Sequence, residues 1–146
     1  MKLAFLLAVL TSGLICATAA ADTPSTGVIQ IDNQAVAAAF AKGGLLIKTN
    51  NFKVIAGRRV APGEVEIHVK DTDVFYIVDG SATFVTGGTA VNPHTSAPDE
   101  IRATEITGGE PHHLTKGDVI IIPNGVPHQF TEVSGTFLYF VVKVSK

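Results

Sequence analysis

The chain has 146 residues, of which 46% are hydrophobic, with a formal net charge of −2 and a single cysteine. This length is usual for one domain, and the apolar content is sufficient for a buried core. The mild negative charge and the lack of any Lys/Arg cluster in the sequence disfavour nucleic acid and anionic membranes as partners.

Residues 1–21 are predicted to be a cleavable secretory signal peptide. Lys2 supplies a positive start, residues 3–17 form an apolar run too short for a membrane anchor, and small residues follow where a signal peptidase cleaves. Cys16 suggests a lipoprotein as an alternative, which the bulky Ile15 before it disfavours. We therefore expect a secreted or periplasmic protein with no membrane association after cleavage. Because the single cysteine would be removed, the mature chain could form no disulfide.

One helix is predicted, over residues 33–42. Asp32 is suited to cap its N-terminus, and Ala, Val and Phe recur on one side of it. Gly43-Gly44 follows, where a helix commonly ends in a left-handed residue.

The remainder of the chain indicates short strands separated by turns. The segments are rich in β-branched and aromatic residues, and Gly, Pro, Asn or Asp separates most of them. The predicted strands lie at 45–50, 52–60, 64–70, 74–80, 81–88, 100–106, 118–123, 128–133 and 136–144. Residues 87–100 are predicted to form a long loop.

This pattern favours an all-β fold, a small antiparallel β-barrel or jelly roll with one short N-terminal helix. Alternating βαβ units fit much less well, because strands follow one another without helices between them. We place the barrel at 54–146, preceded at 22–53 by the helix and a leading strand.

The strand segment 65–70 carries the first candidate functional residues. Side chains alternate between the faces of a strand, so Glu66, His68 and Lys70 share one face. Two interpretations are open: this face lies in water, with Glu66 and Lys70 as a surface ion pair, or His68 is a metal ligand beside Glu66. Imidazole and carboxylate together suit Fe(II), Mn(II), Zn(II), Ni(II) and Cu(II).

Two short motifs resemble those of the cupin superfamily. The motif G-x5-P-x-G-x2-H is met at Gly117, Pro123, Gly125 and His128. The spacing of the motif H-x-H-x4-E-x6-G is matched by Glu66, His68, Asp73 and Gly80. Glu66 stands here in place of the first His of that motif, and Asp73 in place of its Glu.

The resemblance implies a cupin-like, RmlC-like barrel that holds a divalent transition metal: Fe, Mn, Zn, Ni or Cu. It implies Glu66, His68, Asp73 and His128 as the metal ligands, with Glu66 or Asp73 as a catalytic proton acceptor. Asp73 is one methylene shorter than the residue it replaces, so binding through water is an alternative for it. A set of Glu66, His68 and His128 would leave coordination positions open for a substrate or dioxygen.

The ligand is expected to be a small molecule, and the resemblance further implies association into a homodimer. Arg59, Tyr76 and Phe130 are the candidates for substrate binding, with Arg59 suited to a carboxylate or phosphate. Two functions remain open. One is an extracytoplasmic metal-dependent enzyme of dioxygenase, isomerase or lyase type that acts on a small polar molecule. The other is a non-catalytic barrel that binds a carbohydrate or an organic acid.

Overall fold

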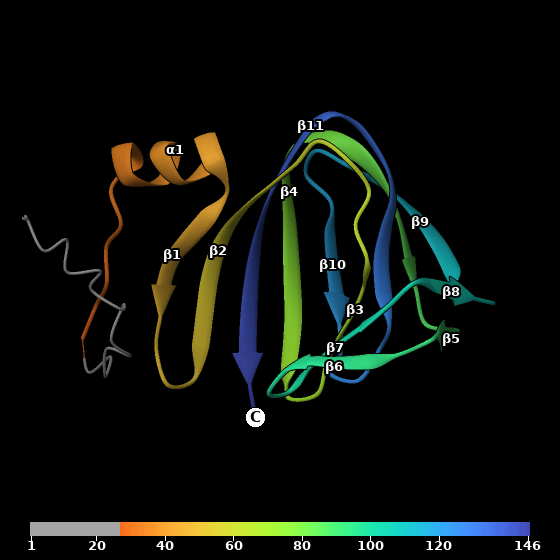
Figure 1. Ribbon diagram of the computed structural model, residues 1–146. Coiled ribbons are helices and arrows are strands. Elements are labelled where there is room, and N and C mark those ends of the chain that lie inside the picture. The colour runs from red at the N-terminus through yellow and green to blue at the C-terminus, as the bar shows by residue number, and fades with distance from the viewer. Residues whose placement is uncertain (1–26) are drawn as a thin grey trace, which may run out of the picture.

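The computed structural model describes residues 27–146, so the predicted signal peptide lies outside the described residues. The described chain is mostly β-structure, with a helix at its N-terminal end (Figure 1). None of its helical residues form a segment long and apolar enough to cross a membrane. In chain order the elements are α1 (Asn33–Lys42), β1 (Gly44–Lys48), β2 (Phe52–Arg59), β3 (Val65–His68), β4 (Asp71–Thr86), β5 (Thr89–Val91), β6 (His94–Ala97), β7 (Glu100–Ala103), β8 (Glu105–Thr107), β9 (Glu110–Thr115), β10 (Val119–Ile122) and β11 (His128–Ser145).

The helix α1 begins and ends where the sequence predicts. The Ala35 backbone N–H donates to the Asp32 carboxylate at 2.8 Å, and Gly43 follows the helix with φ +75°. Phe40 packs edge-on against Phe140 of β11, with ring centroids 4.8 Å apart. The helix therefore rests on the outside of the sheet, next to β1 and β2 (Figure 1).

Two long, bent strands organise the barrel. β4 and β11 pair antiparallel along almost their whole lengths, from His128 opposite Thr86 to Ser145 opposite Asp71. Their halves near Asp71 and Ser145 belong to a first sheet with the order β1-β2-β11-β4-β10. Their other halves belong to a second sheet with the order β9-β4-β11-β3-β7-β6. Figure 1 shows both strands arching over the top of the molecule from one sheet to the other. The predicted antiparallel β-barrel with one N-terminal helix is confirmed.

Several predicted strands are joined in the structure. Segment 74–80 and most of segment 81–88 fall in β4, and the two predicted C-terminal strands fall in β11, because register shifts bend these strands without ending them. Gly80 adopts φ +79° at such a bend, and a Cβ there would lie 2.5 Å from the backbone oxygen of Thr136. The glycine was interpreted as the end of a strand, but it allows β11 to pass closely across a continuous one.

The prediction of a long loop at 87–100 was wrong. This segment contains β5, which pairs with β8, and β6, which pairs with β7. The strand β9 was not predicted either, and it pairs with the second half of β4. Both segments are polar, so β-propensity gave no signal for them, and neighbouring strands supply the pairing that makes them strands.

Aromatic rings fill the core between the two sheets. Phe84 and Phe130 have ring centroids 4.4 Å apart, and Tyr139 contacts both Phe75 and Phe130 at 5.2 and 5.5 Å. Gly57 of β2 lies opposite Tyr139 in the register, and its lack of a side chain leaves space for the tyrosine ring.

Gly57→Ala should displace Tyr139 and destabilise the protein. A Cβ at this position would lie 2.2 Å from the tyrosine ring, and forcing atoms into a packed core costs about 1–3 kcal/mol. Urea denaturation would measure the loss. Gly44→Ala is the matched control, because no heavy atom lies within 4 Å of the Cβ it would add. Equal stability of the two variants would contradict this account of the core.

Candidate metal site

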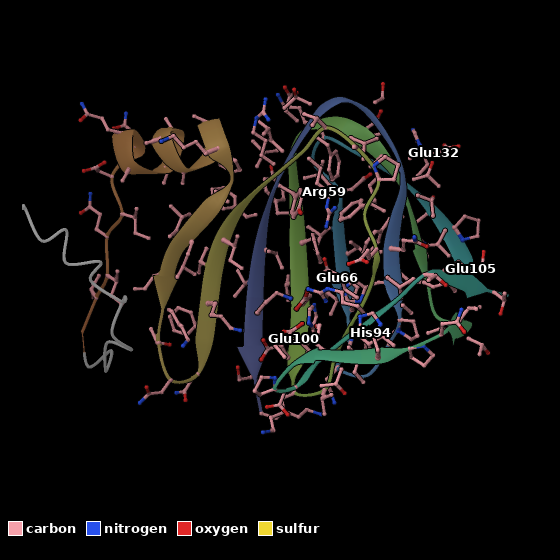
Figure 2. The ribbon with its side chains drawn as sticks, in the orientation of Figure 1. Arg59, Glu66, His94, Glu100, Glu105 and Glu132 are labelled. Carbon is pink, nitrogen blue, oxygen red and sulfur yellow. The ribbon has the colours of Figure 1, made fainter. Side chains whose placement is uncertain are left out.

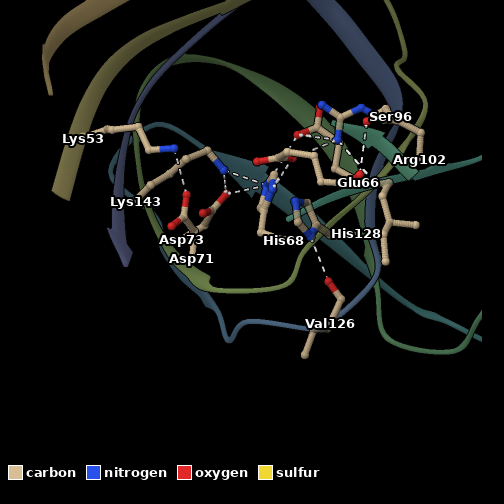
Figure 3. A network of polar contacts seen from close by, with 12 residues as sticks. Lys53, Glu66, His68, Asp71, Asp73, Ser96, Arg102, Val126, His128 and Lys143 are labelled. Atoms are coloured by element: carbon tan, nitrogen blue, oxygen red, sulfur yellow. Dashed lines mark hydrogen bonds and ion pairs between the residues drawn. The ribbon is translucent and has the colours of Figure 1, made fainter. Parts of the chain in front are cut away.

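The candidate site forms where β3 meets β11. Glu66 and His68 project from the same face of β3, as strand periodicity predicts, and His128 begins β11 opposite Glu66. One ligand atom from each of these three residues lies within 4.8 Å of the other two. The rings of His68 and His128 have centroids 5.0 Å apart. Sheet closure therefore places together two histidines that are distant in the sequence (Figure 3).

Both histidines are held through their Nδ1 atoms. His68 Nδ1 lies 2.7 Å from Glu100 Oε2, and His128 Nδ1 lies 3.0 Å from the backbone oxygen of Val126 (Figure 3). Both oxygens are acceptors, so we assign the proton of each ring to Nδ1, which leaves a lone pair on each Nε2. A histidine that binds a metal is commonly anchored in this way through its other nitrogen.

The Nε2 atom of His128 is the strongest indication of a metal-binding site among these residues. It has no hydrogen-bond partner, although the residue is only 3% exposed. A buried polar atom without a partner costs about 1–3 kcal/mol. The Glu66 carboxylate and the His68 ring lie close to it, and two imidazoles with a carboxylate are a ligand set for divalent transition metals. These residues therefore fit such an ion.

A cation of the chain itself, Lys143 of β11, lies beside this group. Its Nζ is 2.6 Å from Asp73 Oδ2 and 2.6 Å from His68 Nε2. The Lys143 and Asp73 side chains are only 12% and 2% exposed. An ammonium group can only donate, so His68 Nε2 accepts, which agrees with the assigned tautomer. Asp73 is thus paired with Lys143 and lies 3.3 Å from His68 Nε2, beside the ligand group formed by Glu66 and the two histidines.

Burial and charge act in opposite directions on the titratable groups. Burial is the largest effect on His128 and lowers its pKa, which keeps this imidazole neutral and able to bind a metal. Burial opposes the charged form of Asp73, but hydrogen bonds and charges of His68 and Lys143 overcome it and lower the pKa of this carboxyl. Burial would also lower the pKa of His68, but the contact with Asp73 and the charges of Asp73 and Glu100 outweigh burial and the Lys143 charge, so its pKa is raised. A proton, Lys143 and a metal ion therefore compete for His68 Nε2.

Glu66 and His128 line a small cavity inside the barrel. Its volume is about 40 Å³, which is enough for an ion with one or two water-sized neighbours and far below the size of a pocket for a drug-like ligand. The residues around it are Arg59, Glu64, Glu66, Asp73, Phe75, Phe84, His128, Gln129, Phe130, Tyr139 and Lys143.

Two of the three residues predicted to bind substrate, Arg59 and Phe130, line this cavity. The Arg59 guanidinium lies 4.7 Å above the Phe130 ring, and it donates to Glu66 Oε1 and to the Tyr139 hydroxyl, both at 3.3 Å. Figure 2 shows Arg59 and Glu66 within the barrel. Tyr76 is 48% exposed and is not among the residues around the cavity. It points away because strand alternation turns it to the outside of β4.

Two charged residues of the site were missed by the sequence analysis. Lys143 gave a usable signal, since it is the only charged residue in the apolar segment 136–144. It lies on the same face of the strand as Tyr139 and Val141, which are both buried, so its side chain points inward. Glu100 gave no such signal. It reaches His68 because it lies opposite that residue in the pairing of β3 with β7, which is a tertiary contact.

Comparisons with known proteins identify the fold. No protein-family model matches the chain, and no curated protein matches it. Among solved structures, it is similar to DMSP lyase DddQ from Ruegeria pomeroyi, with 16% identity and a TM-score of 0.52 over 71% of this chain and 46% of that one. The chain thus spans less than half of the lyase. A candidate mannose-6-phosphate isomerase from Ralstonia eutropha matches with 13% identity and a TM-score of 0.50, over 71% of this chain and 83% of that one.

A third similar structure is an uncharacterized protein with a double-stranded β-helix domain from Klebsiella pneumoniae. It shares 16% identity and has a TM-score of 0.50, with 69% of each chain covered. Matches at such low identity show the fold alone. Together with the strand topology, they show that this chain has a double-stranded β-helix fold, which is the fold that the resemblance of its two motifs implied.

Lys143→Met should strongly destabilise the metal-free protein, because it leaves the Asp73 carboxylate buried without its cation. Removing one partner of a buried ion pair typically costs about 3–5 kcal/mol. Urea denaturation in the presence of a chelator would measure the loss.

Lys70→Met is the matched control for this substitution. Lys70 pairs with Asp99 at 2.9 Å, but both side chains are exposed to solvent, so the loss of stability should be much smaller than in Lys143→Met. Adding Asp73→Asn to Lys143→Met should restore part of the lost stability. Equal losses of stability in Lys70→Met and Lys143→Met would contradict the conclusion that Lys143 stabilises the buried Asp73 carboxylate.

Proposed function

We propose that this chain is a metal-binding cupin-fold protein that acts, with a divalent transition metal, on a small polar molecule outside the cytoplasm. One observation carries the proposal. The buried and unpartnered Nε2 of His128 lies in one group with the His68 ring and the Glu66 carboxylate. Such a two-histidine, one-carboxylate set leaves further coordination positions open for a substrate.

Glu66, His68 and His128 are the residues that would hold the ion. The ion would supply a Lewis acid for an oxygen atom of the substrate, or a binding position for dioxygen. Around it, Arg59 would orient an anionic group of the substrate, although its present partner Glu66 competes for the guanidinium. Glu66 or Asp73 would be the proton acceptor, within the cavity that both residues line together with several aromatic rings.

The reaction class is proposed no more narrowly than dioxygenase, isomerase or lyase. Two of the similar structures are named as a lyase and as a candidate isomerase, which agrees with this range. Their fold is shared by unrelated activities, so the reaction must be argued from the site. Export by the signal peptide at 1–21 remains part of the proposal, and a small molecule is the proposed ligand.

A second function is favoured by the position of Lys143. Its ammonium already contacts His68 Nε2 and neutralises Asp73, so the cluster is charge-paired without any metal. This supports the alternative of a non-catalytic barrel that binds an organic acid or a carbohydrate. The two functions differ in whether the purified protein contains a metal.

Elemental analysis of the protein, purified without a histidine tag from a metal-replete culture, tests the proposal. We expect one equivalent of a transition metal in the wild type and a loss of most of it in His128→Ala and in Glu66→Ala, with circular dichroism unchanged. His113→Ala is the matched control, because His113 is exposed on β9 and is not in the ligand group. A wild type that stays metal-free in all preparations would refute the proposal and favour the alternative.

Glu100→Gln should weaken metal binding without removing a ligand. Glu100 accepts the Nδ1 proton of His68, and losing such an anchoring carboxylate typically lowers metal affinity about 10- to 100-fold. Competition with a chromogenic chelator for Zn²⁺ would measure the change. Glu110→Gln, at an exposed position of β9, should leave the affinity unchanged. Equal affinities for the two variants would mean that Glu100 does not support the site.

A further inference from the structure

A second and larger cavity opens at one end of the barrel. It is a cleft of about 450 Å³ lined by the β1–β2 hairpin, the turn between β3 and β4, and the turn between β6 and β7. Figure 1 shows these three turns at the lower end of the view. The volume falls within the range of about 300–1,000 Å³ that is usual for small-molecule sites. The cavity at Glu66 has only about 40 Å³, so the cleft offers much more room for a ligand.

The first sheet contributes cations to this cleft. Lys53 of β2 lies 3.0 Å from Asp71 Oδ2 (Figure 3), and Asp71 Oδ1 accepts from the Ser145 hydroxyl at 2.6 Å. Asp71 is only 8% exposed, so a buried carboxylate holds the Lys53 ammonium at the cleft. An ammonium has three donors, so Lys53 can also bind a carboxylate of a ligand. Lys48 of β1 lines the same side of the cleft.

The hairpin that carries these two lysines is held by its own hydrogen bonds. The Thr49 hydroxyl donates to the backbone oxygen of Phe52 and accepts from its N–H, both at 3.1 Å. The Thr49 backbone N–H donates to the same Phe52 oxygen at 2.8 Å, and Thr49 is only 6% exposed. This side of the cleft is therefore formed before a ligand binds, which lowers the entropic cost of binding.

The second sheet contributes carboxylates from the turn between β6 and β7. Asp99 lies in this turn, and its backbone oxygen accepts from the Val69 N–H at 2.9 Å. The Asp99 carboxylate pairs with Lys70 at 2.9 Å, and both side chains are exposed. Glu100 begins β7, and its Oε2 lies 2.7 Å from His68 Nδ1. A carboxylate accepts several hydrogen bonds, so both acids can also bind a cationic group of a ligand.

The charges of the cleft favour a ligand that carries charges of both signs. Three lysines and three carboxylates line it, so their charges cancel: Lys48, Lys53, Lys70, Asp71, Asp99 and Glu100. A simple anion would be attracted by the lysines of the first sheet and repelled by the acids of the second, and a simple cation would meet the reverse. A zwitterion gains at both sides. None of the described residues around the cleft is aromatic, so an apolar ring would find no matching surface.

We propose that this cleft binds a small zwitterion with one carboxylate and one cationic group. Lys53 binds the carboxylate, and Asp99 binds the cationic group. The cleft shares no lining residue with the cavity at Glu66 and needs no metal ion, so the proposal is independent of the proposed function. Glu100 connects the two sites, because it lines the cleft and also anchors His68.

Calorimetric titration of the protein expressed from its full-length sequence, freed of metal by a chelator and then dialysed, tests this proposal. The probes are glycine, β-alanine, 4-aminobutyrate and 6-aminohexanoate, which carry their two charges at increasing separation. We expect at least one of them to bind with a dissociation constant of about 1 mM or lower. The unsubstituted carboxylate and the alkylamine of the same length should bind about 10-fold more weakly or worse, because each lacks one of the two charges.

Lys53→Met and Asp99→Asn should each weaken binding of the best probe about 10-fold or more. In Lys53→Met the zwitterion should bind no better than the alkylamine, and in Asp99→Asn no better than the carboxylate. Asp99 has φ +62°, which asparagine also adopts, so this substitution keeps the backbone. Lys116→Met and Glu105→Gln are the matched controls, because both residues are exposed and lie outside the cleft. They should bind the probe as the wild type does.

Circular dichroism must show that the variants are folded. If Lys53→Met is not, because Asp71 has lost its cation, Lys53→Met combined with Asp71→Asn removes both charges of that pair and should show the same loss of affinity. A wild type that binds none of the probes would overturn the proposal. Equal affinities for a zwitterion and its singly charged analogues would overturn it as well. So would binding that appears only after a transition metal is added, because the probe would then bind at the metal.

Discussion

The pairing of β4 with β11 is the constraint on which the rest of the structure depends. Both strands run through the two sheets, and their register places Lys143 opposite Asp73 at one end and His128 opposite Thr86 at the other. β3 joins the second half of β11 at a single position, His128 opposite Glu66. One continuous ladder therefore positions the buried ion pair and the ligand group together, because a shift by one residue would turn every one of these side chains to the outside.

The barrel encloses several charged side chains, which is unusual for a small apolar core. Asp73 is almost fully buried and is stabilised by Lys143, while Glu66 and Glu100 are partly buried near Arg59 and Arg102. A divalent ion bound by Glu66 and the histidines would add positive charge next to Lys143. Because the ammonium and the ion would share His68 Nε2, metal binding requires the Lys143 contact with that nitrogen to break. The Asp73 contact is free of this conflict and can persist.

Near the end of β11, the first sheet carries charged side chains on its inner face and apolar side chains on its outward face, which is the reverse of the usual arrangement. There the inner positions hold Lys53, Asp73 and Lys143, and the outward positions are apolar. The sequence of β10 shows the same property in its simplest form, since Val119–Ile122 is apolar on both faces. Its outward side chains, Val119 and Ile121, are 59% and 61% exposed. The candidate metal site lies inside the barrel, and these apolar side chains lie on the opposite side of the pairing of β4 with β11.

Local sequence signals were enough to predict α1, because its cap, its length and its terminal glycine all lie within one short segment of the chain. It was also enough to place Glu66 and His68 on one face of a strand, and the motif at His128 supported the fold. Strand boundaries near Gly80, the strands within 87–100, and the partners Glu100 and Lys143 were not predictable in this way. Each of these depends on which strands pair and in which register, and that choice is made by the packing of the whole barrel. The sequence by itself determined an all-β barrel, one capped helix and the residue types of the site. Only the tertiary structure decided that Lys143 pairs with Asp73 while His128 keeps a free nitrogen, because both depend on contacts between strands far apart in the chain.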